Sequence, residues 1–221
     1  MKVSVILPIM IFNTRQEIFT QCCIKLMRDL TNIPFELVIV ETGSMKFKHY
    51  ADIYLHFSEP SSYTKEFNQA IDQALGDIIV QIANDIFVSQ NWLEALLKCF
   101  EIKDCGVATL ASSDLKLKSK DAIMEGIYGP LMAWKYRFKF DEDFEDIFSD
   151  SDLVMRMYEA GYRSLRNWKV MIDHLNQETY SQKYTEEERA NRFSQAREMF
   201  IEKHKFSTHL VYRALTEGWI V

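Results

Sequence analysis

The segment QIANDIFV, residues 81–88, marks the point where a buried run of the chain gives way to polar residues. The run 77–83 (DIIVQIA) is apolar, as in a strand buried in a parallel sheet, and a helical pattern follows at 89–100. Asn84 and Asp85 lie between the two. Two interpretations fit this pair: a turn that leads into the helix, or a ligand-binding group at the carboxyl edge of a sheet.

Strand and helix patterns alternate outward from this segment. Short apolar runs predict strands over 3–8, 36–41, 51–57, 77–83 and 105–110. A helix is expected from Asn13 or Thr14, and the residues that recur on it every fourth position are Ile18, Cys22, Leu26 and Leu30. A second helix, 64–76, has Phe67, Ile71 and Ala74 or Leu75 on one face and Gly76 as its C-cap. Ser89 is the expected cap of the third helix.

The second half is less regular. Strands are predicted over 127–134 and 167–175, on either side of an acidic stretch, 141–152, and a helix, 151–163, that stops at Gly161. The inward residues of this helix are expected to be Leu153, Met157 and Ala160. A long amphipathic helix, 185–205, begins with a capping box of Thr185 and Glu188, and its Phe193, Met199 and Phe200 are expected to pack. The alternation predicts a single α/β domain: a mostly parallel central sheet, helices on both faces and a C-terminal amphipathic helix.

Composition narrows the class of protein. The 221 residues suffice for one α/β domain, and 26 basic against 32 acidic residues give no electrostatic reason to expect a nucleic acid or an anionic membrane as a general partner. The four cysteines form no CxxC spacing, which favours reduced core thiols in a cytoplasmic protein. The start, MKVSVILPIMIF, fits a first strand better than a signal peptide, and no run is long enough to form a transmembrane segment.

Polar residues follow several predicted strands. Glu41, Asn84-Asp85 and Asp173-His174 each come at a strand's carboxyl end, where open α/β sheets bind ligands. Carboxylate and imidazole groups suit a divalent cation such as Mn²⁺ or Mg²⁺, which in turn can hold a diphosphate. Asp150 and Asp152 precede a helix, where a carboxylate can accept a proton from an attacking hydroxyl. Asp150 is the expected base, kept ionised by the helix dipole, whereas Asp152 is expected to make structural hydrogen bonds.

These segments together resemble a family 2 glycosyltransferase with the GT-A fold. VSVILP (3–8) and VIVETGS (38–44) are similar to that family's first strand and its VVDNGS turn. The stretch 65–96 resembles its R-x-x-N-x-G-x-x-x-A-x-G segment, which leads into the metal-binding DxD or NND. The stretch 140–163 (FDEDFEDIFSDSDLVMRMYEAGYR) resembles FDE-x-F followed by EDxDL and AGYR. The likeness runs from the first strand to about His174, and its strength lies in the order and spacing of the motifs.

The resemblance implies a role for particular residues. Pro8 and Ile9 would line the base of a nucleotide-sugar donor, and Glu41 would hold its nucleoside. On the helix 64–76, Lys65 and Asn68 match donor-side positions of the family, and Asn84 is an uncharged neighbour of the metal site. Asp85 would bind a divalent metal, Mn²⁺ or Mg²⁺, together with His174, and Asp150 would be the general base.

The chain departs from the family pattern at four positions. Ala83 stands at the first DxD position, so the metal would have one direct carboxylate fewer. Ser149 stands where the family often has glutamate, Ala70 replaces a common glycine, and Thr42 replaces an acidic or amide residue.

The resulting expectation is an inverting glycosyltransferase that moves a sugar from a nucleoside diphosphate sugar, with a UDP-sugar favoured, to an acceptor hydroxyl. The acceptor stays open between a saccharide, a lipid-linked sugar, a protein and a modified nucleic-acid base, and so does the oligomeric state. Residues 1–110 would form the nucleotide-sugar-binding half, 111–180 the acceptor and catalytic half, and 181–221 a helical segment. Two alternatives remain: a sugar nucleotidyltransferase, disfavoured because IMIFNTRQ lacks glycine and lysine, and a non-catalytic nucleotide-sugar-binding relative.

Overall fold

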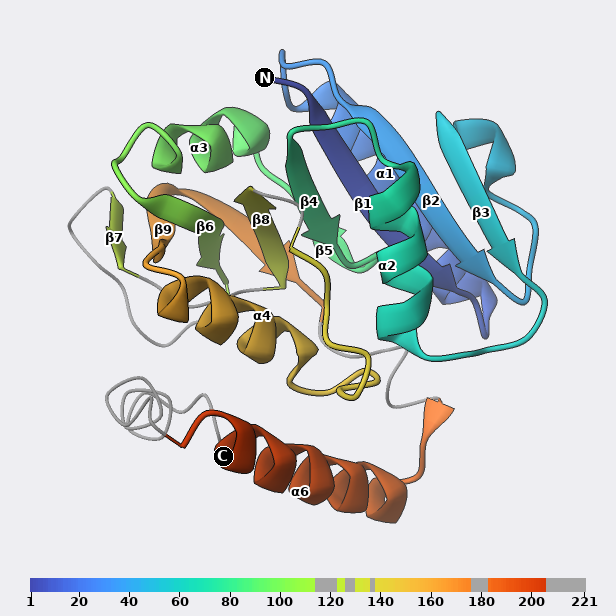
Figure 1. Cartoon of the computed structure of the whole chain (residues 1–221). Coiled ribbons are helices and arrows are strands. Elements are labelled where there is room, and N and C mark those ends of the chain that lie inside the picture. Colours follow the sequence, from blue (N-terminus) through green and yellow to red (C-terminus); the bar gives the residue numbers. More distant parts are fainter. Residues whose placement is uncertain (114–122, 126–129, 136–137, 176–182, 206–221) are drawn as a thin grey trace.

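The computed structural model describes residues 1–113, 123–125, 130–135, 138–175 and 183–205. Its strands form a nine-stranded sheet in the order β3-β2-β1-β4-β8-β6-β9-β5, with β7 paired to β9. The first four are β1 (Val3–Met10), β2 (Glu36–Thr42), β3 (Ile53–Phe57) and β4 (Ile78–Ile82), and each pairs in parallel with its neighbours among them. This parallel half confirms the α/β sheet expected from the alternating pattern (Figure 1).

The other half of the sheet mixes strand directions. It contains β5 (Ile86–Phe87), β6 (Cys105–Ser112), β7 (Ile123–Glu125), β8 (Leu131–Lys135) and β9 (Arg163–His174). β8 is antiparallel to both β4 and β6, β6 and β9 are parallel, and β5 and β7 are antiparallel to β9. β9 begins four residues earlier than the predicted strand, and residues 127–129 of the strand predicted at 127–134 lie outside the described residues.

Helices cover both faces of the sheet, as predicted. α1 (Thr14–Asp29) and α3 (Trp92–Cys99) pack on one face, and α2 (Tyr63–Gln73) and α4 (Ser149–Glu159) pack on the other (Figure 1). Strand alternation makes this possible: Val5 and Leu7 of β1 point to the first face, and Ile6 points to the second. Lys48–Tyr50 form a short 3-10 helix, η1.

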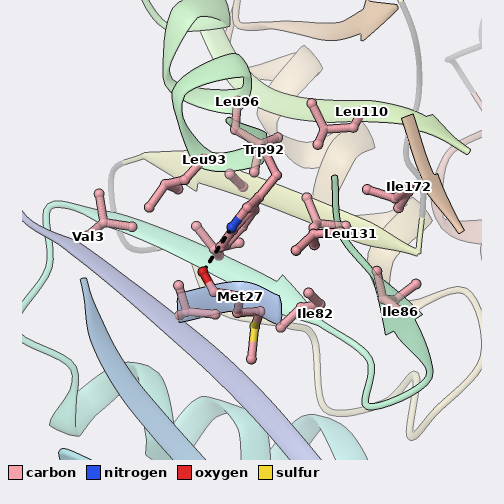
Figure 2. Close-up of a cluster of buried hydrophobic side chains, with 14 of the residues drawn as sticks. Val3, Met27, Ile82, Ile86, Trp92, Leu93, Leu96, Leu110, Leu131 and Ile172 are labelled. Carbon is pink, nitrogen blue, oxygen red and sulfur yellow. Dashed lines mark hydrogen bonds between the residues drawn. The ribbon is translucent and has the colours of Figure 1, made fainter. Parts of the chain in front are cut away.

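Trp92 joins several elements in the core on the α1/α3 face. Its side chain is completely buried, and its indole N–H donates a hydrogen bond of 3.1 Å to the backbone carbonyl of Met27 in α1. Figure 2 shows this bond, with Leu96 of the same helix, Leu110 of β6 and Leu131 of β8 around the ring. A buried indole N–H without an acceptor would be costly, so this bond fixes α3 against the end of α1.

The predicted inward face of α1 was wrong at Ile18 and Cys22, whereas Leu26 and Leu30 are half-buried and pack against the core. Ile18 is 51% exposed and Cys22 is exposed, whereas the helix buries Gln16, Thr20, Cys23, Ile24 and Met27. The predicted stripe of apolar residues spaced by four therefore lies along the edge of the buried face. Residues beside that stripe on the helix pack against the sheet instead. Cys22 is therefore not a core thiol. Cys23, Cys99 and Cys105 are buried, and all four cysteines are free.

Three predicted helix ends also differ from the structure. α2 ends at Gln73 rather than at a Gly76 cap, and Leu75 is 68% exposed. The N-cap of α3 is Asn91, with a positive φ of 61°, whereas the Ser89 hydroxyl donates to the Met171 carbonyl. α4 begins at Ser149, two residues before the predicted start, and Ala160, expected to point inward, is exposed.

The stop of α4 and the start of α6 were predicted correctly. Gly161 follows α4 with a φ of +89°, a conformation that glycine adopts without strain. α6 (Glu186–Lys203) begins at a capping box formed by Thr185 and Glu188. Its Phe193 and Phe200 pack against Phe144, Phe148 and Met155, which confirms the packing role of this helix and places it beneath α4 (Figure 1). Among the described helices, none has the length and apolar character to cross a membrane.

Candidate functional site

A cavity of about 320 Å³ opens at the carboxyl edge of the parallel strands. Its walls come from the ends of β1, β2 and β4, the start of α2 and the start of α4. Parallel strands end at the same edge, so side chains far apart in sequence converge there. The residues of the predicted site that line the cavity are Pro8, Ile9, Asn84, Asp85, Asp150 and His174.

The Asn84-Asp85 pair occupies a tight turn. The Ile86 N–H donates a hydrogen bond of 3.2 Å to the Ala83 carbonyl, so the pair forms the two central residues between β4 and β5. The Asn84 side-chain amide donates to the Thr20 hydroxyl of α1 at 2.9 Å, which fixes the turn on that helix. The pair therefore makes a turn, which leads into β5, and it also lines the cavity, whereas its role in binding a ligand stays a prediction.

Asp85 and His174 face each other across a strand pairing. β5 is antiparallel to β9 with Ile86 opposite His174, and the Leu175 N–H donates to the Asp85 carbonyl. The His174 Nε2 lies 3.7 Å from the Asp85 Oδ1, with 16% and 12% of the two side chains exposed. One carboxylate and one imidazole fit a borderline divalent cation such as Mn²⁺. Among the described residues, no group of three or more His, Cys, Asp or Glu is placed to hold a metal ion.

Asp150 lies in the first turn of α4 and is partly buried. Its Oδ1 accepts a hydrogen bond of 2.8 Å from the Ser151 N–H. Burial raises the pKa of Asp150, and the hydrogen bonds from Ser151 offset only part of that rise. The N-cap is Phe148, and Asp150 lies in the first turn, so the expected effect of the helix dipole on its ionisation stays a prediction beside the opposing effect of burial.

Tyr63 lines the cavity beside Asp150. Burial first, and then the negative charge of Asp150, raise the pKa of the Tyr63 phenol. Its ring packs against Phe67 and Phe140. The phenol is therefore a neutral hydrogen-bond donor close to the candidate base.

Glu41 does not line the cavity. It is completely buried, and its carboxylate accepts hydrogen bonds from the Ser44 hydroxyl, the Lys46 and Phe47 N–H groups and the Tyr54 hydroxyl. Burial alone would raise the pKa of Glu41, but these four bonds reverse the effect and lower it. The contacts of Glu41 hold the loop 43–47 against β3, and they do not support direct contact with a nucleoside.

Lys65 and Asn68 also lie outside the cavity. Lys65 is exposed on α2. The Asn68 side chain exchanges two hydrogen bonds with the backbone of Phe140, at 2.9 and 3.0 Å, and donates to Glu142 at 3.1 Å. Asn68 therefore fixes the segment before α4 on α2, a structural role.

Several polar residues line the cavity that were not among the predicted site residues. Glu66 is 8% exposed, and its carboxylate accepts from the Thr42 hydroxyl at 2.8 Å and from the Ser61 N–H and hydroxyl at 2.9 Å each. Gln81 on β4 lines the cavity as well. A charged residue beside Phe67 on the buried face of α2 is the one sequence signal for this group.

The C-terminal helix contacts one wall of the cavity, at Asp146 in the loop before α4. Asp146 and Lys183 both line the cavity, with their charged atoms 3.5 Å apart. Arg192 of α6 pairs with Asp146 at 2.6 Å and with Glu145 at 2.8 Å. α6 thus neutralises Asp146 and holds the loop before α4 in place.

The electrostatic character of the cavity follows from these pairs. Arg192 and Lys183 neutralise the charge of Asp146. The other carboxylates along the described walls of the cavity are those of Glu66, Asp85 and Asp150. An anionic diphosphate would be repelled by this surface unless a cation lay between them.

Comparisons with known proteins agree on the fold. No model of a protein family matches the sequence, and no curated protein matches it. The chain is similar in structure to the mannosyltransferase PcManGT from Pyrobaculum calidifontis in complex with GDP-Man and Mn²⁺, with a TM-score of 0.62 and 16% identity over 81% of this chain and 58% of that one. It is also similar to S. aureus TarS in complex with UDP, with a TM-score of 0.60 and 17% identity over 78% and 60% of the two chains.

A third similar structure is GalNAc-T7 with UDP, GalNAc and Mn²⁺, with a TM-score of 0.60 and 11% identity over 78% of this chain and 43% of that one. The chain thus spans about three fifths or less of the length of these glycosyltransferases. At such identities the likeness concerns the fold, and this chain has the GT-A-like α/β fold that the three glycosyltransferases share.

Proposed function

We propose that this chain is a glycosyltransferase that moves a sugar, with inversion, from a nucleoside diphosphate sugar to an acceptor hydroxyl. The observation that carries the proposal is the cavity, which gathers Pro8, Asp85, Asp150 and His174 at one edge of a GT-A-like sheet. The similar structures hold UDP or GDP-Man, and two of them hold Mn²⁺, which supports a nucleotide-sugar donor and a divalent cation.

In the proposed reaction Asp150 accepts the proton of the acceptor hydroxyl. The hydroxyl oxygen then forms a bond to the anomeric carbon, while the bond from that carbon to the diphosphate breaks and its electron pair leaves with the nucleoside diphosphate. The raised pKa of Asp150 suits this role, because a base works best when its pKa approaches the pH of operation. A neighbouring Tyr63 phenol can hold the acceptor by donating a hydrogen bond.

Asp85 and His174 would hold a divalent cation, Mn²⁺ or Mg²⁺. Such a cation supplies positive charge that stabilises the departing diphosphate. Ala83 removes one carboxylate from the usual pattern, and His174, 3.7 Å from Asp85, would be a second ligand in its place. Pro8 and Ile9 would contact the donor from the end of β1, and Asn84 would hold the turn through Thr20.

The remaining assignments extend this proposal. The donor half, 1–110, contributes β1, β2, β4 and the 83–86 turn, and the half 111–180 contributes Asp150 and His174. A UDP-sugar is the favoured donor, and a saccharide, lipid-linked sugar, protein or modified nucleic-acid base is the acceptor. The buried free thiols Cys23, Cys99 and Cys105 support a cytoplasmic location.

The proposal is tested by incubating the purified chain with UDP-sugars and GDP-mannose, with and without Mn²⁺, and measuring release of the nucleoside diphosphate. Release that requires the cation and is lost in Asp150→Asn supports the enzyme. A thermal shift with nucleotide but no release from any donor would support the non-catalytic binding relative instead, because specific ligands stabilise a folded protein by mass action.

A further inference from the structure

We propose that Glu66 recognises the nucleobase of the nucleotide-sugar donor and that this nucleobase is uracil. This inference rests on the proposed function, since it requires a nucleoside diphosphate in the cavity. It concerns the three residues Thr42, Ser61 and Glu66, which line the cavity and are joined by hydrogen bonds.

The strand order assigns these groups to opposite ends of the cavity. β1 lies between β2 and β4 in the sheet, so the end of β1, with Pro8 and Ile9, forms the middle of the cavity wall. Thr42 lies at the end of β2, and Glu66 bonds to it from α2. Asp85 and His174 lie beyond β4, on the other side of β1. A ligand whose diphosphate meets the Asp85-His174 pair therefore extends across Pro8 and presents its other end, the base, to Glu66.

Glu66 is held in place by its own hydrogen bonds. Its Oε1 accepts from the Ser61 N–H and the Ser61 hydroxyl, both at 2.9 Å, and its Oε2 accepts from the Thr42 hydroxyl at 2.8 Å. A carboxylate has about four lone-pair sites, so these three donors leave roughly one, on Oε2. A buried acceptor with one remaining site matches a ligand that offers one N–H.

Uracil meets this condition because its pairing edge has a single N–H, at N3, between two carbonyls. Guanine presents two adjacent donor groups, and the amino groups of adenine and cytosine each carry two hydrogens, one of which would find no acceptor on Glu66. Oε2 also repels the unprotonated N3 of cytosine, since a carboxylate oxygen is an acceptor only.

The first experiment measures nucleotide affinity without any substitution. Dissociation constants for UDP, CDP, GDP, ADP and 3-methyluridine diphosphate are measured by calorimetry with the intact chain in Mn²⁺. We expect UDP to bind most tightly, and 3-methyluridine diphosphate, which lacks the N–H, to bind roughly 10- to 100-fold more weakly, the usual effect of losing a hydrogen bond to a charged group. Equal binding of UDP and its methylated analogue, or tighter binding of a purine nucleotide, would overturn the inference.

The second experiment uses Glu66→Gln. The Ser61 N–H can only donate, so the amide oxygen of the substituted side chain is expected at the Oε1 position, with its NH₂ group at Oε2 facing the ligand. Thr42 can accept from that NH₂, since a hydroxyl serves in either role. An N–H now opposes the uracil N–H and matches the N3 acceptor of cytosine. We expect the ratio of UDP to CDP affinity to fall at least about 10-fold.

The matched control is Glu94→Gln. Glu94 of α3 also accepts from a hydroxyl, that of Thr31, and from a backbone N–H, that of Asn32, but it does not line the cavity. Its variant should keep the wild-type ratio of UDP to CDP affinity. If the wild-type chain binds UDP and a folded Glu66→Gln variant keeps the wild-type ratio of UDP to CDP affinity, the role of Glu66 is wrong. The proposed function is not affected by that result. Failure of the wild-type chain to bind any nucleoside diphosphate sinks the proposed function itself.

Discussion

Asp152 of α4 and His204, just after α6, are in direct contact: the His204 Nε2 lies 2.9 Å from the Asp152 Oδ1. The other ring nitrogen, Nδ1, lies 3.1 Å from Glu159, so the imidazole bridges two carboxylates. Asp152 is completely buried and also pairs with Arg156 at 2.7 Å and Lys203 at 2.6 Å. This cluster attaches the end of α6 to the helix that carries Asp150, and it confirms the expected structural role of Asp152.

The contact predicts a pH-dependent stability. Burial alone would lower the pKa of His204, but the hydrogen bonds and charges of Asp152 and Glu159 outweigh it and raise the pKa. Because the folded pKa is raised, this stabilisation is complete below the unfolded value and is lost as pH rises through the folded value. His204→Gln should lower the free energy of unfolding by roughly 1–3 kcal/mol at about pH 6, and by less as pH rises.

Urea titrations across about pH 5.5 to 9.5 would measure this effect. His49→Gln is the control, since His49 is exposed beside Tyr50 and should change stability by less than about 0.5 kcal/mol at every pH. A stability loss in His204→Gln that stays constant over the whole range would contradict an imidazolium at this position.

Asp150→Asn should separate catalysis from folding. It keeps the shape of the side chain and removes its basicity, so we expect the turnover rate to fall by about 100-fold or more with donor affinity nearly unchanged. In the wild-type chain kcat/KM should fall as pH drops through the pKa of Asp150, above the ordinary aspartate value of about 4. Steady-state kinetics against pH would show this limb, and the variant should lack it.

Asp152→Asn is the contrasting variant two residues away. It leaves Arg156, Lys203 and His204 without their common anion, and we expect the free energy of unfolding to fall by roughly 3–5 kcal/mol. Unchanged stability in Asp152→Asn together with abolished transfer would reassign the base to Asp152.

Removing the carboxylate of Asp85 should weaken the binding of the cation. In the presence of UDP, Asp85→Asn is expected to bind Mn²⁺ roughly 10- to 100-fold more weakly, because a charged ligand is replaced by a neutral one. Calorimetry or the electron paramagnetic resonance signal of free Mn²⁺ would measure this. Asp173→Asn is the control, as Asp173 is exposed, neighbours His174 and does not line the cavity. Equal losses in both variants would remove the special role of Asp85.

Gly76 is required for a reason other than the predicted helix C-cap. A Cβ on Gly76 would lie 2.5 Å from the Ser4 backbone nitrogen, so Gly76 is required by the close approach of two backbones rather than by a positive φ. Gly161 is the opposite case, with φ at +89° and no atom within 4 Å of a Cβ. Gly161→Asn should cost less than about 1 kcal/mol, since asparagine tolerates this conformation, whereas Gly76→Asn should cost about 3 kcal/mol or prevent folding. Similar thermal shifts for the two variants would contradict this distinction.

Several features of this protein are determined within a few residues of sequence. The alternation of Val5, Ile6 and Leu7, the stop at Gly161 and the capping box of α6 depend on strand pleat, backbone conformation and local hydrogen bonds. The sequence therefore predicted the α/β sheet, the covering helices and a polar turn at Asn84-Asp85. It also predicted that Asp150 and His174 belong near that turn, because their segments resemble motifs in a known order.

Other features depend on which elements meet. The buried face of α1, the enclosure of Glu41 by the loop 43–47 and the place of Glu66 in the cavity were decided by packing against elements distant in sequence. Local periodicity cannot predict these three features. The same stripe of apolar residues, or the same carboxylate on a helix, can end up buried or exposed, depending on which distant elements pack against it. Asp85 approaches His174 because β5 pairs with β9 in the antiparallel direction. These two strands are far apart in sequence, so no rule based on neighbouring residues predicts that they pair.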